Sequence, residues 1–509
     1  MIRPALPILL SIPLLVASAL ICNAPVPASR SSRQATAESA ILTVAAGPRL
    51  SPPSPPTLST ATSIAAPSPT PDWSTPGPIF VYQTAAGDTL AALSARFGVD
   101  PGQILADRFL PSDGYLPTGV RMEIPNVLEA VSPGVPVLPD SEVVYSPSAA
   151  DFDVGSFVRS AGGFLAGYVE TVDDGSVLSG AAIVQRVADE LSVNPRLLLA
   201  LLEYRSGWVF GAPADGRATT YPIGFRIPGR RGLYQELKIA ATQLNQGYYG
   251  WRDGTLSEAQ FEDGSAVRLH PALNAGSVAL MHLLAMLSPP TRWKESLYDA
   301  GSLTFEYAAH FGDPWVRAQA TGPVLPPALV QPLLELPFAP GERWSLTGGP
   351  HPAWNAGTPR GALDFSPAEG GEPCAVAVRW ATASAPGVIV RAASNAVALD
   401  LDGDGREQTG WVVVYLHLAE DGLIDRGASV RTGDRLGHPS CEGGAATGKH
   451  VHIARKYNGE WLAADGPVPL MLSGWRAVAG ERNYLGALVR DGERVTSDSS
   501  GQQGSTITR

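Results

Sequence analysis

Residues 448–454 read GKHVHIA, and this stretch decides the fold of the C-terminal third of the chain. His450 and His452 are two positions apart, which is the side-chain period of a β-strand, so both rings should project from one face. Similar β-branched or apolar runs recur nearby, separated by Gly- and Pro-rich turns. These runs are Gly387–Val390, Ala396–Leu401, Trp411–Leu418 and Lys449–Ala454. The pattern predicts an antiparallel, all-β domain over residues 323–496.

The same domain holds five of the eight histidines, at positions 351, 417, 438, 450 and 452. A catalytic zinc takes three nitrogen or oxygen ligands and keeps one position for water, while other groups move protons. His417 ends a predicted strand and could approach His450 and His452 from a neighbouring strand. Asp364 is set among apolar residues, where a carboxylate is costly unless paired or metal-bound. A half-buried strand histidine and a structural Asp–His pair remain the alternatives to a metal site.

Three separated motifs strengthen the metal interpretation. His351 ends the motif at 348–351 (GGPH), and Asp364 follows it thirteen positions later. Residues 415–418 (YLHL) and 448–452 (GKHVH) complete the set. In this order they resemble the β-lytic and staphylolysin branch of the lysostaphin-type zinc endopeptidases, over about 130 residues.

The resemblance implies a role for each motif residue. His351, Asp364 and His452 would bind one zinc ion per chain, and His417 with His450 would form the acid/base and oxyanion-stabilising pair. Most lysostaphin-type enzymes place the first histidine four residues before the aspartate. Arg360 occupies that position here, so the metal site depends on His351. His438 matches no motif and is interpreted as a loop histidine, and no HExxH zincin motif occurs in the sequence.

A short N-terminal block, residues 79–126, has a predicted strand–helix–helix–strand order. Asp88 is placed to cap the first helix, and a second short helix is expected over Pro101–Ala106. The order, with the GDTL motif at 87–90 and FGV at 97–99, resembles a LysM domain. That likeness implies binding of N-acetylglucosamine-containing glycan; a spacer domain that binds nothing is the alternative.

The middle block, residues 150–322, is predicted to be mostly helical. Asn194 and Pro195 supply the favoured order of cap and proline at a helix start. Further helices are predicted over 183–191, 232–247, 273–287 and 302–311. Residues 193–208 resemble the opening of a lytic transglycosylase domain, but Arg205 stands where that family has its catalytic glutamate. Arginine does not donate a proton near neutral pH, so this domain is predicted to be non-catalytic, a helical scaffold or a glycan-binding module.

The chain ends and joints complete a multidomain α+β organisation. Residues 1–28 read as a secretory signal peptide, with a lipid anchor at Cys22 as the alternative. A Pro/Ser/Thr-rich linker is expected over 29–78 and another linker over 127–149, and the polar tail 497–509 is predicted to be disordered. No transmembrane segment is expected after signal removal.

Charge and cysteine content limit the function classes. With 37 Lys and Arg against 48 Asp and Glu, the net charge of −11 excludes a strongly basic nucleic-acid binder. If cleavage follows Ala28, Cys374 and Cys441 are the remaining cysteines, and an oxidising compartment favours a disulfide between them. Residues 400–405 (DLDGDG) have the spacing of the first half of a calcium loop, but Trp411 replaces the closing glutamate. A polar β-turn is therefore favoured there over Ca²⁺.

Together these patterns predict a secreted or cell-surface zinc metalloendopeptidase. It would hydrolyse peptide bonds of bacterial peptidoglycan and be targeted to the wall by the LysM block. The alternative is a catalytically silent wall-binding regulator of a cell-wall amidase. Regulators of that kind usually lack metal ligands, whereas all five motif positions are filled in this chain.

Overall fold

The computed structural model describes residues 78–509. The predicted signal peptide, Cys22 and nearly all of the first linker lie outside the described residues. The described part of the chain belongs to one compact unit that spans residues 72–509. Within the described residues, no helix is both long and apolar enough to cross a membrane.

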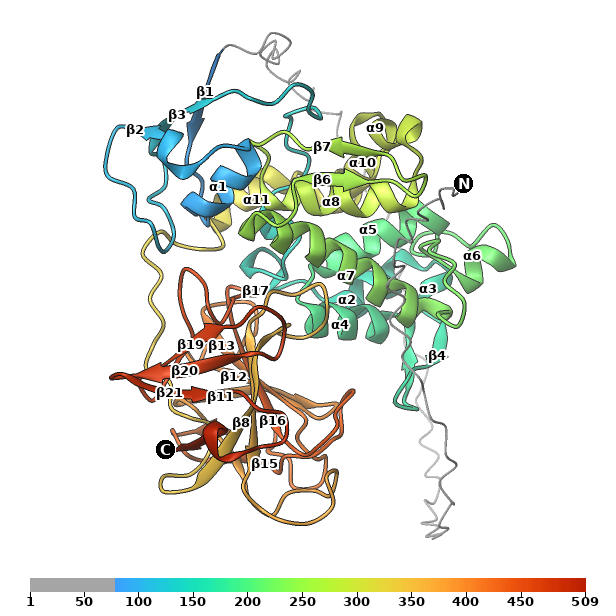
Figure 1. Cartoon of the computed structure of the whole chain (residues 1–509). Helices are drawn as coiled ribbons and strands as arrows, with labels where there is room; N and C mark the ends of the chain where they lie inside the picture. Colours follow the sequence, from blue (N-terminus) through green and yellow to red (C-terminus); the bar gives the residue numbers. More distant parts are fainter. Residues whose placement is uncertain (1–77) are drawn as a thin grey trace, which may run out of the picture. The chain divides into compact units, whose positions relative to one another are not determined.

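The N-terminal region is a small sheet with one helix (Figure 1). It contains β1 (Ile79–Gln83), α1 (Leu90–Phe97), β2 (Leu105–Ala106) and β3 (Arg121–Pro125), with sheet order β1-β3-β2. Two predictions need correction. Thr89, not Asp88, caps α1, because its side chain accepts from the amide of Ala92. Asp88 instead pairs with Arg96 in a buried site. The second expected helix is only a 3₁₀ turn, Pro101–Gln103, because the chain leaves it for β2.

The middle region is helical, as predicted, with two short β-hairpins that the sequence did not reveal. Its helices are α2 (Val154–Ala161), α3 (Phe164–Gly167), α4 (Gly180–Leu191), α5 (Pro195–Ser206), α6 (Gly216–Thr220), α7 (Gly232–Asp253), α8 (Ala275–Leu287), α9 (Pro290–Tyr298), α10 (Leu303–Phe311) and α11 (Pro314–Thr321). Its hairpins are β4 (Val169–Thr171) with β5 (Val177–Ser179), and β6 (Glu258–Gln260) with β7 (Ala266–Arg268).

Local sequence explains where helix α5 begins. The side chain of Asn194 accepts from the amide of Arg196 and Pro195 begins α5, as the cap-then-proline order predicts.

The prediction that residues 127–149 form a linker is wrong. Val137, Leu138 and the 143–145 segment are buried in the hydrophobic core of the helical region. Burial of these apolar side chains in the core stabilises the fold, which a solvated linker would not do.

The C-terminal region is the predicted antiparallel β domain. Its strands are β8 (Arg343–His351), β9 (Ala362–Pro367), β10 (Ala381–Thr382), β11 (Gly387–Ala393), β12 (Ala396–Asp400), β13 (Trp411–Leu416), β14 (Ser429–Val430), β15 (Arg435–Gly437), β16 (Val451–Tyr457), β17 (Glu460–Trp461), β18 (Met471–Leu472), β19 (Trp475–Ala479), β20 (Gly486–Arg490), β21 (Glu493–Thr496) and β22 (Thr506–Thr508). The main sheet runs β14-β11-β12-β13-β16-β9-β8-β22, with β17 on β16. A second sheet runs β18-β19-β20-β21, and β10 pairs with β15.

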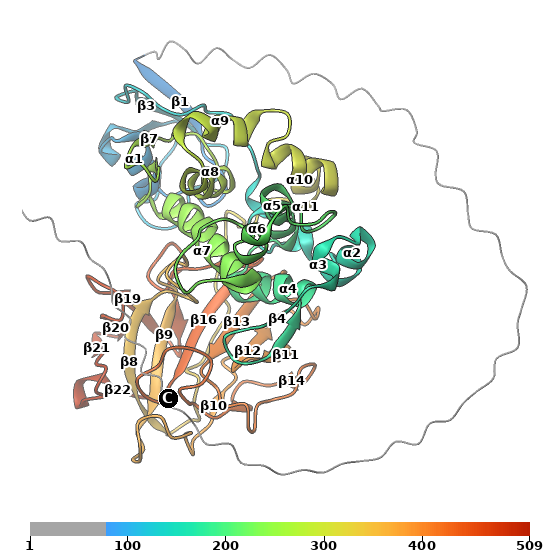
Figure 2. The same ribbon diagram turned by 90° about the vertical axis from the view of Figure 1, so that its right-hand side faces the viewer.

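Both faces of the main sheet are covered. On β13, Val413 and Tyr415 belong to the core of the β domain, whereas Val412 and Val414 belong to the core shared with the helical region. Figure 2 shows α4 and α7 beside this sheet. Burial on both faces explains why the β13 sequence is a continuous apolar run rather than an alternating one.

The C-terminal tail is not disordered, contrary to the prediction. Its last strand, β22, pairs antiparallel with β8, and Ile507 is buried opposite Trp344. The tail is polar in sequence apart from Ile507. Burial of Ile507 and the pairing of β22 with β8 hold the tail on the sheet. β22 therefore closes the sheet edge next to the strand that carries His351.

Candidate active site

Three neighbouring strands bring the predicted metal ligands together. His452 on β16 lies directly opposite Asp364 on β9 in the antiparallel register. His351 is the last residue of β8, which pairs with β9 through a register shift beside Gly348. A Cβ atom on Gly348 would lie 2.3 Å from Oδ2 of Asp364, so glycine leaves the room that this carboxylate occupies. The strand order β16-β9-β8 thus gathers residues from three separate motifs.

Hydrogen bonds to carbonyl oxygens orient both histidine rings. Nδ1 of His351 is 2.9 Å from the oxygen of Gly349, and Nε2 of His452 is 2.9 Å from the oxygen of Ala353. A carbonyl oxygen only accepts, so each of these nitrogens carries the proton. The other nitrogen of each neutral ring, Nε2 of His351 and Nδ1 of His452, then presents its lone pair to the shared centre.

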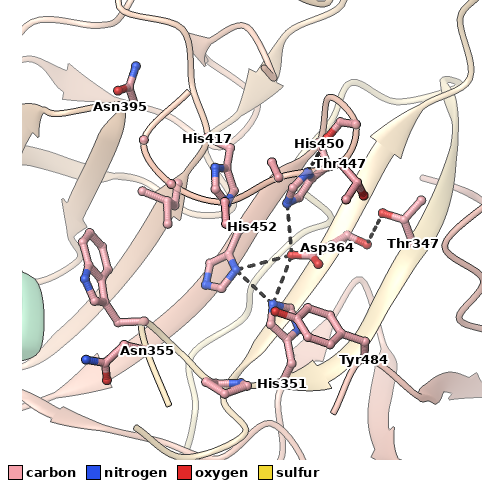
Figure 3. Close-up of a pocket in the computed structure, with 18 of the residues that line it drawn as sticks. Thr347, His351, Asn355, Asp364, Asn395, His417, Thr447, His450, His452 and Tyr484 are labelled. Atoms are coloured by element: carbon pink, nitrogen blue, oxygen red, sulfur yellow. Dashed lines mark hydrogen bonds and ion pairs between the residues drawn. The ribbon is translucent and has the colours of Figure 1, made fainter. Parts of the chain in front are cut away.

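The three inward atoms form a tight triangle (Figure 3). Nε2 of His351 lies 3.3 Å from Oδ1 of Asp364, and Nδ1 of His452 lies 3.4 Å from the same oxygen. The two nitrogens are 3.1 Å apart. Ligands about 2.0–2.2 Å from a tetrahedral zinc lie about 3.3–3.6 Å from one another. The triangle has nearly that size, and all three residues are buried.

The carboxylate oxygen that forms one corner of this triangle supports a cation site. Oδ1 of Asp364 is buried and receives no hydrogen bond within the described part of the chain. A buried, unsatisfied carboxylate oxygen is costly, and a bound cation removes that cost. The donor set of two imidazoles and one carboxylate is suited to zinc. The residues present therefore fit a metal ion of this kind.

His417 and His450 stand at the rim of the triangle. Their ring centroids are 4.5 Å apart, and Nε2 of His450 lies 3.7 Å from Oδ1 of Asp364. Nδ1 of His417 donates to the oxygen of Glu442, and Nδ1 of His450 donates to the oxygen of Gly448. Both rings, when neutral, therefore keep an unprotonated Nε2. His417 has a left-handed backbone, with φ of 65°, at the point where the chain leaves β13.

Burial and the charges of neighbouring groups shift the pKa values of the site residues. Burial alone raises the pKa of Asp364, but its interactions with His351, His452 and His450 outweigh burial and hold that pKa well below its usual value. Burial lowers the pKa of His351, but the negative charge of Asp364 outweighs burial and raises it. Burial, with repulsion from His450 and His452, lowers the pKa of His417 to about 4. His417 is therefore neutral at neutral pH.

The five residues open onto a cavity of about 1440 Å³. Tyr484 lines it and stacks on His351, with ring centroids 4.2 Å apart. No sequence motif marks this tyrosine, which lies between β19 and β20 and forms an isolated bridge with Gly349. The cavity wall also includes Tyr234 and Lys238 of α7, from the helical region. No local signal could have indicated that contribution.

The structure contains the disulfide that the cysteine content favours. Cys374 and Cys441 are bonded, with Cα atoms 5.3 Å apart. The neighbouring Glu442 accepts the ring proton of His417 through its carbonyl oxygen. The amide of Lys449, next to His450, donates to Pro373. The disulfide thus joins the two loops that carry these contacts.

Arg360 and His438 lie away from the metal triangle. Arg360, which replaces the first histidine of most lysostaphin-type enzymes, donates to the oxygens of Pro350, Gly480 and Arg482. It therefore braces loops around the site. His438 packs against Trp380 and contacts the oxygen of Arg379, as a loop histidine would.

In the segment that resembles a transglycosylase domain, Arg205 and Glu203 make hydrogen bonds within the protein. Nε of Arg205 donates to the oxygen of Ile223. Glu203 accepts from the amides of Val209 and Phe210, beyond the end of α5. These contacts account for both charged groups without a substrate.

The acidic turn after β12 brings Asp400, Asp402 and Asp404 together, with one oxygen of each within 4.8 Å of the others. Asp400 accepts from the amides of residues 402, 403 and 405. Backbone donors thus satisfy its carboxylate within the turn, which is the arrangement expected of a polar β-turn.

Comparisons with known proteins relate the chain to a metallopeptidase family. A family model described as "LasA, N-terminal domain" matches residues 136–324. Protease LasA of Pseudomonas aeruginosa (strain UCBPP-PA14) is 28% identical over 323 residues, 58% of this chain and 69% of that protein. Beta-lytic metalloendopeptidase of Lysobacter enzymogenes is 30% identical over 160 residues, 30% of this chain and 83% of that protein. The chain belongs to the LasA and beta-lytic family of M23 metallopeptidases.

A solved structure titled as the M23 metalloprotease pseudoalterin from the deep sea is 26% identical and covers 33% of this chain and 96% of that one, with a TM-score of 0.28. Family membership identifies the chain as a metalloendopeptidase. The LasA N-terminal match covers the helical region, so this region is similar to the corresponding part of a LasA-family protein. The LysM and transglycosylase likenesses stay predictions.

Proposed function

We propose that this metallopeptidase is a secreted zinc enzyme that hydrolyses peptide bonds of bacterial peptidoglycan. His351, Asp364 and His452 would hold the zinc ion, and His417 and His450 would move protons and stabilise the oxyanion. The observation that carries the proposal is the triangle of 3.1–3.4 Å formed by two histidine lone pairs and one unsatisfied carboxylate oxygen.

A zinc ion in this position would polarise the scissile carbonyl and lower the pKa of a bound water towards ~7. His417 and His450 offer unprotonated Nε2 atoms at the rim of the site. Either ring can take a proton at Nε2 from the attacking water and return it to the leaving amine. The protonated ring also carries a positive charge next to the developing oxyanion, which stabilises it.

The cavity supports a polymeric substrate. Its volume of about 1440 Å³ exceeds the roughly 300–1,000 Å³ of ordinary small-molecule pockets. Tyr484 and Trp354 add aromatic surface to its wall. A peptide with its linked glycan has the size and mixed polarity for such a groove.

The test is cleavage of purified cell wall by the full chain. Wild type, His450→Ala and a chelator-treated sample are incubated with wall while bound zinc is measured. New amino termini from wild type alone support the proposal. New reducing ends without new amines would instead indicate a transglycosylase, and zinc-free protein that binds wall without cleaving it would support the regulator alternative.

Wall targeting by the N-terminal region forms a separate part of the proposal. The strand–helix–strand fold with sheet order β1-β3-β2 is compatible with the LysM resemblance. Phe109, in the loop between β2 and β3, leaves 88% of its surface exposed, and an exposed aromatic ring can stack on a sugar face. Phe109→Ala should weaken sedimentation with insoluble wall, while Leu333→Ala, another exposed apolar position, should not.

A further inference from the structure

A short loop of the β domain connects the metal triangle to the helical region. This loop, residues 353–358, follows His351 and begins with the carbonyl group that accepts the Nε2 proton of His452 at 2.9 Å. That hydrogen bond leaves Nδ1 of His452 free to face the metal centre. The position of the Ala353 oxygen therefore decides the orientation and tautomer of one proposed ligand.

The loop is held in one shape by its own polar groups. Oγ1 of Thr358 accepts from the amides of Trp354 at 2.9 Å and Asn355 at 3.3 Å. Oδ1 of Asn355 accepts from the amide of Gly357 at 3.1 Å. These bonds connect Asn355 to the backbone next to Ala353.

Asn355 attaches this loop to helix α7. Its Nδ2 donates to Oγ1 of Thr242 at 2.7 Å, across 113 positions of sequence. Oγ1 of Thr242 donates its own proton to the oxygen of Lys238 one turn earlier, so a lone pair is left for Asn355. A Cβ on Gly357 would lie 2.3 Å from the oxygen of Thr242, so glycine allows the loop to touch the helix backbone. Figure 3 shows Asn355 and His452 among the residues that line the cavity.

We infer that Thr242 and Asn355 are positioning residues for the metal ligand His452, so that α7 of the helical region helps to set the zinc affinity of the β domain. The inference rests on the proposed function. Partners of metal-bound histidines fix ring orientation, and their loss weakens metal binding. Thr242 and Asn355 act one step further out, through the backbone of Ala353.

The experiment measures zinc affinity of the full chain by competition with a fluorescent chelator. Thr242→Val removes the acceptor with little change of shape, and Asn355→Ala removes the donor. Each should weaken zinc binding by about 3- to 10-fold, less than the ~10–100-fold typical of a direct partner of a ligand. Asn355→Ala also removes the acceptor of the Gly357 amide, whereas Thr242 acts through Asn355, so the double variant should bind zinc about as well as Asn355→Ala alone.

Matched variants separate positioning from a general effect on folding. Thr242→Ser keeps the hydroxyl group and should retain wild-type zinc affinity. Thr321→Val removes a similar hydroxyl bond to the preceding turn of α11 and should leave zinc affinity unchanged. The visible spectrum of the Co²⁺-loaded protein gives a second readout, because it responds to ligand geometry, and it should change only for Thr242→Val and Asn355→Ala.

The outcomes are distinct. If wild type binds zinc but Thr242→Val and Asn355→Ala bind it equally well, the inference is overturned and the proposed function stands. Strictly additive losses in the double variant would also overturn it, since the two groups would then act separately. If wild type binds no zinc at all, the proposed function fails, and the inference with it.

Discussion

Nε2 of His351 lies 3.1 Å from Nδ1 of His452, although the residues are 101 positions apart. In the neutral rings both atoms carry lone pairs, because the opposite nitrogens donate to the carbonyl groups of Gly349 and Ala353. Two lone pairs so close repel each other unless a proton or a metal ion lies between them. Oδ1 of Asp364, 3.3–3.4 Å from both, supplies the negative charge that attracts such a cation.

Loss of the carboxylate should therefore abolish metal binding. Asp364→Asn keeps the shape of the side chain but removes the charge, and its zinc affinity should fall by more than the ~100-fold that loss of an outer partner can cost. Zinc content after dialysis, measured by atomic absorption, checks this. His438→Ala is the matched control, because His438 lies against Trp380 outside the triangle, and it should retain zinc. Full zinc occupancy in Asp364→Asn would contradict the assignment.

The rim histidines should affect the reaction but not the metal. In His417→Ala or His450→Ala the rate of peptide-bond cleavage should fall by about 10²–10⁴-fold, the usual contribution of a general acid or base, while zinc remains bound. The double variant should lose less than the product of the two single losses, because the residues act on one proton transfer. Zinc loss in either single variant would instead place that histidine among the ligands.

The disulfide should stabilise the fold and support His417. Replacing Cys374 and Cys441 together by serine opens a loop with a sequence separation of 67 residues and should cost about 2–4 kcal/mol of unfolding free energy. Because Glu442, next to Cys441, holds the ring of His417, the cleavage rate should fall as well. Thermal unfolding with and without reductant measures the first effect. Reductant should lower the midpoint of wild type and leave the serine variant unchanged.

The electrostatic influence of Glu407 in the β domain on Asp189 of α4 should make stability pH-dependent. Burial and the nearby charge of Glu407 raise the pKa of Asp189 to about 7. In the unfolded chain this carboxyl ionises near pH 4, so stability is lost as pH rises from about 4 to 7, and the loss is complete above 7.

Asp189→Asn removes that penalty while it keeps a polar group facing Gln185. The variant should be more stable than wild type by at least ~1.4 kcal/mol at pH 8, the equivalent of one pKa unit, and nearly equal at pH 4. Thermal unfolding across this pH range measures the difference. A stability difference that does not depend on pH would reject the explanation.

The C-terminal strand should contribute to stability despite its polar sequence. Ile507 of β22 is buried against the main sheet, so Ile507→Ala should cost about 2–5 kcal/mol. Ile227, which is exposed in the helical region, gives the matched control Ile227→Ala with little effect. Equal midpoints of thermal unfolding for both variants would show that β22 detaches easily in solution.

Local sequence predicted most elements, since their signals lie within a few residues. The apolar runs at 387–390, 396–401, 411–418 and 449–454 became β11, β12, β13 and β16. The cap and proline at 194–195 marked the start of α5. Local signals failed where a distant partner decided the outcome. The polar tail 497–509 was expected to be disordered, but its strand β22 pairs with β8.

The sequence by itself determined which chemistry is available: the five site residues, their motifs and the two paired cysteines. Only the tertiary structure decided how these groups meet. The strand order β16-β9-β8 places three side chains around one point, β22 docks on β8, and α7 reaches the loop that holds His452. The physical reason is that backbone preference and hydrophobic period act over a few residues. Strand order, register and packing between regions depend on the free energy of the whole chain.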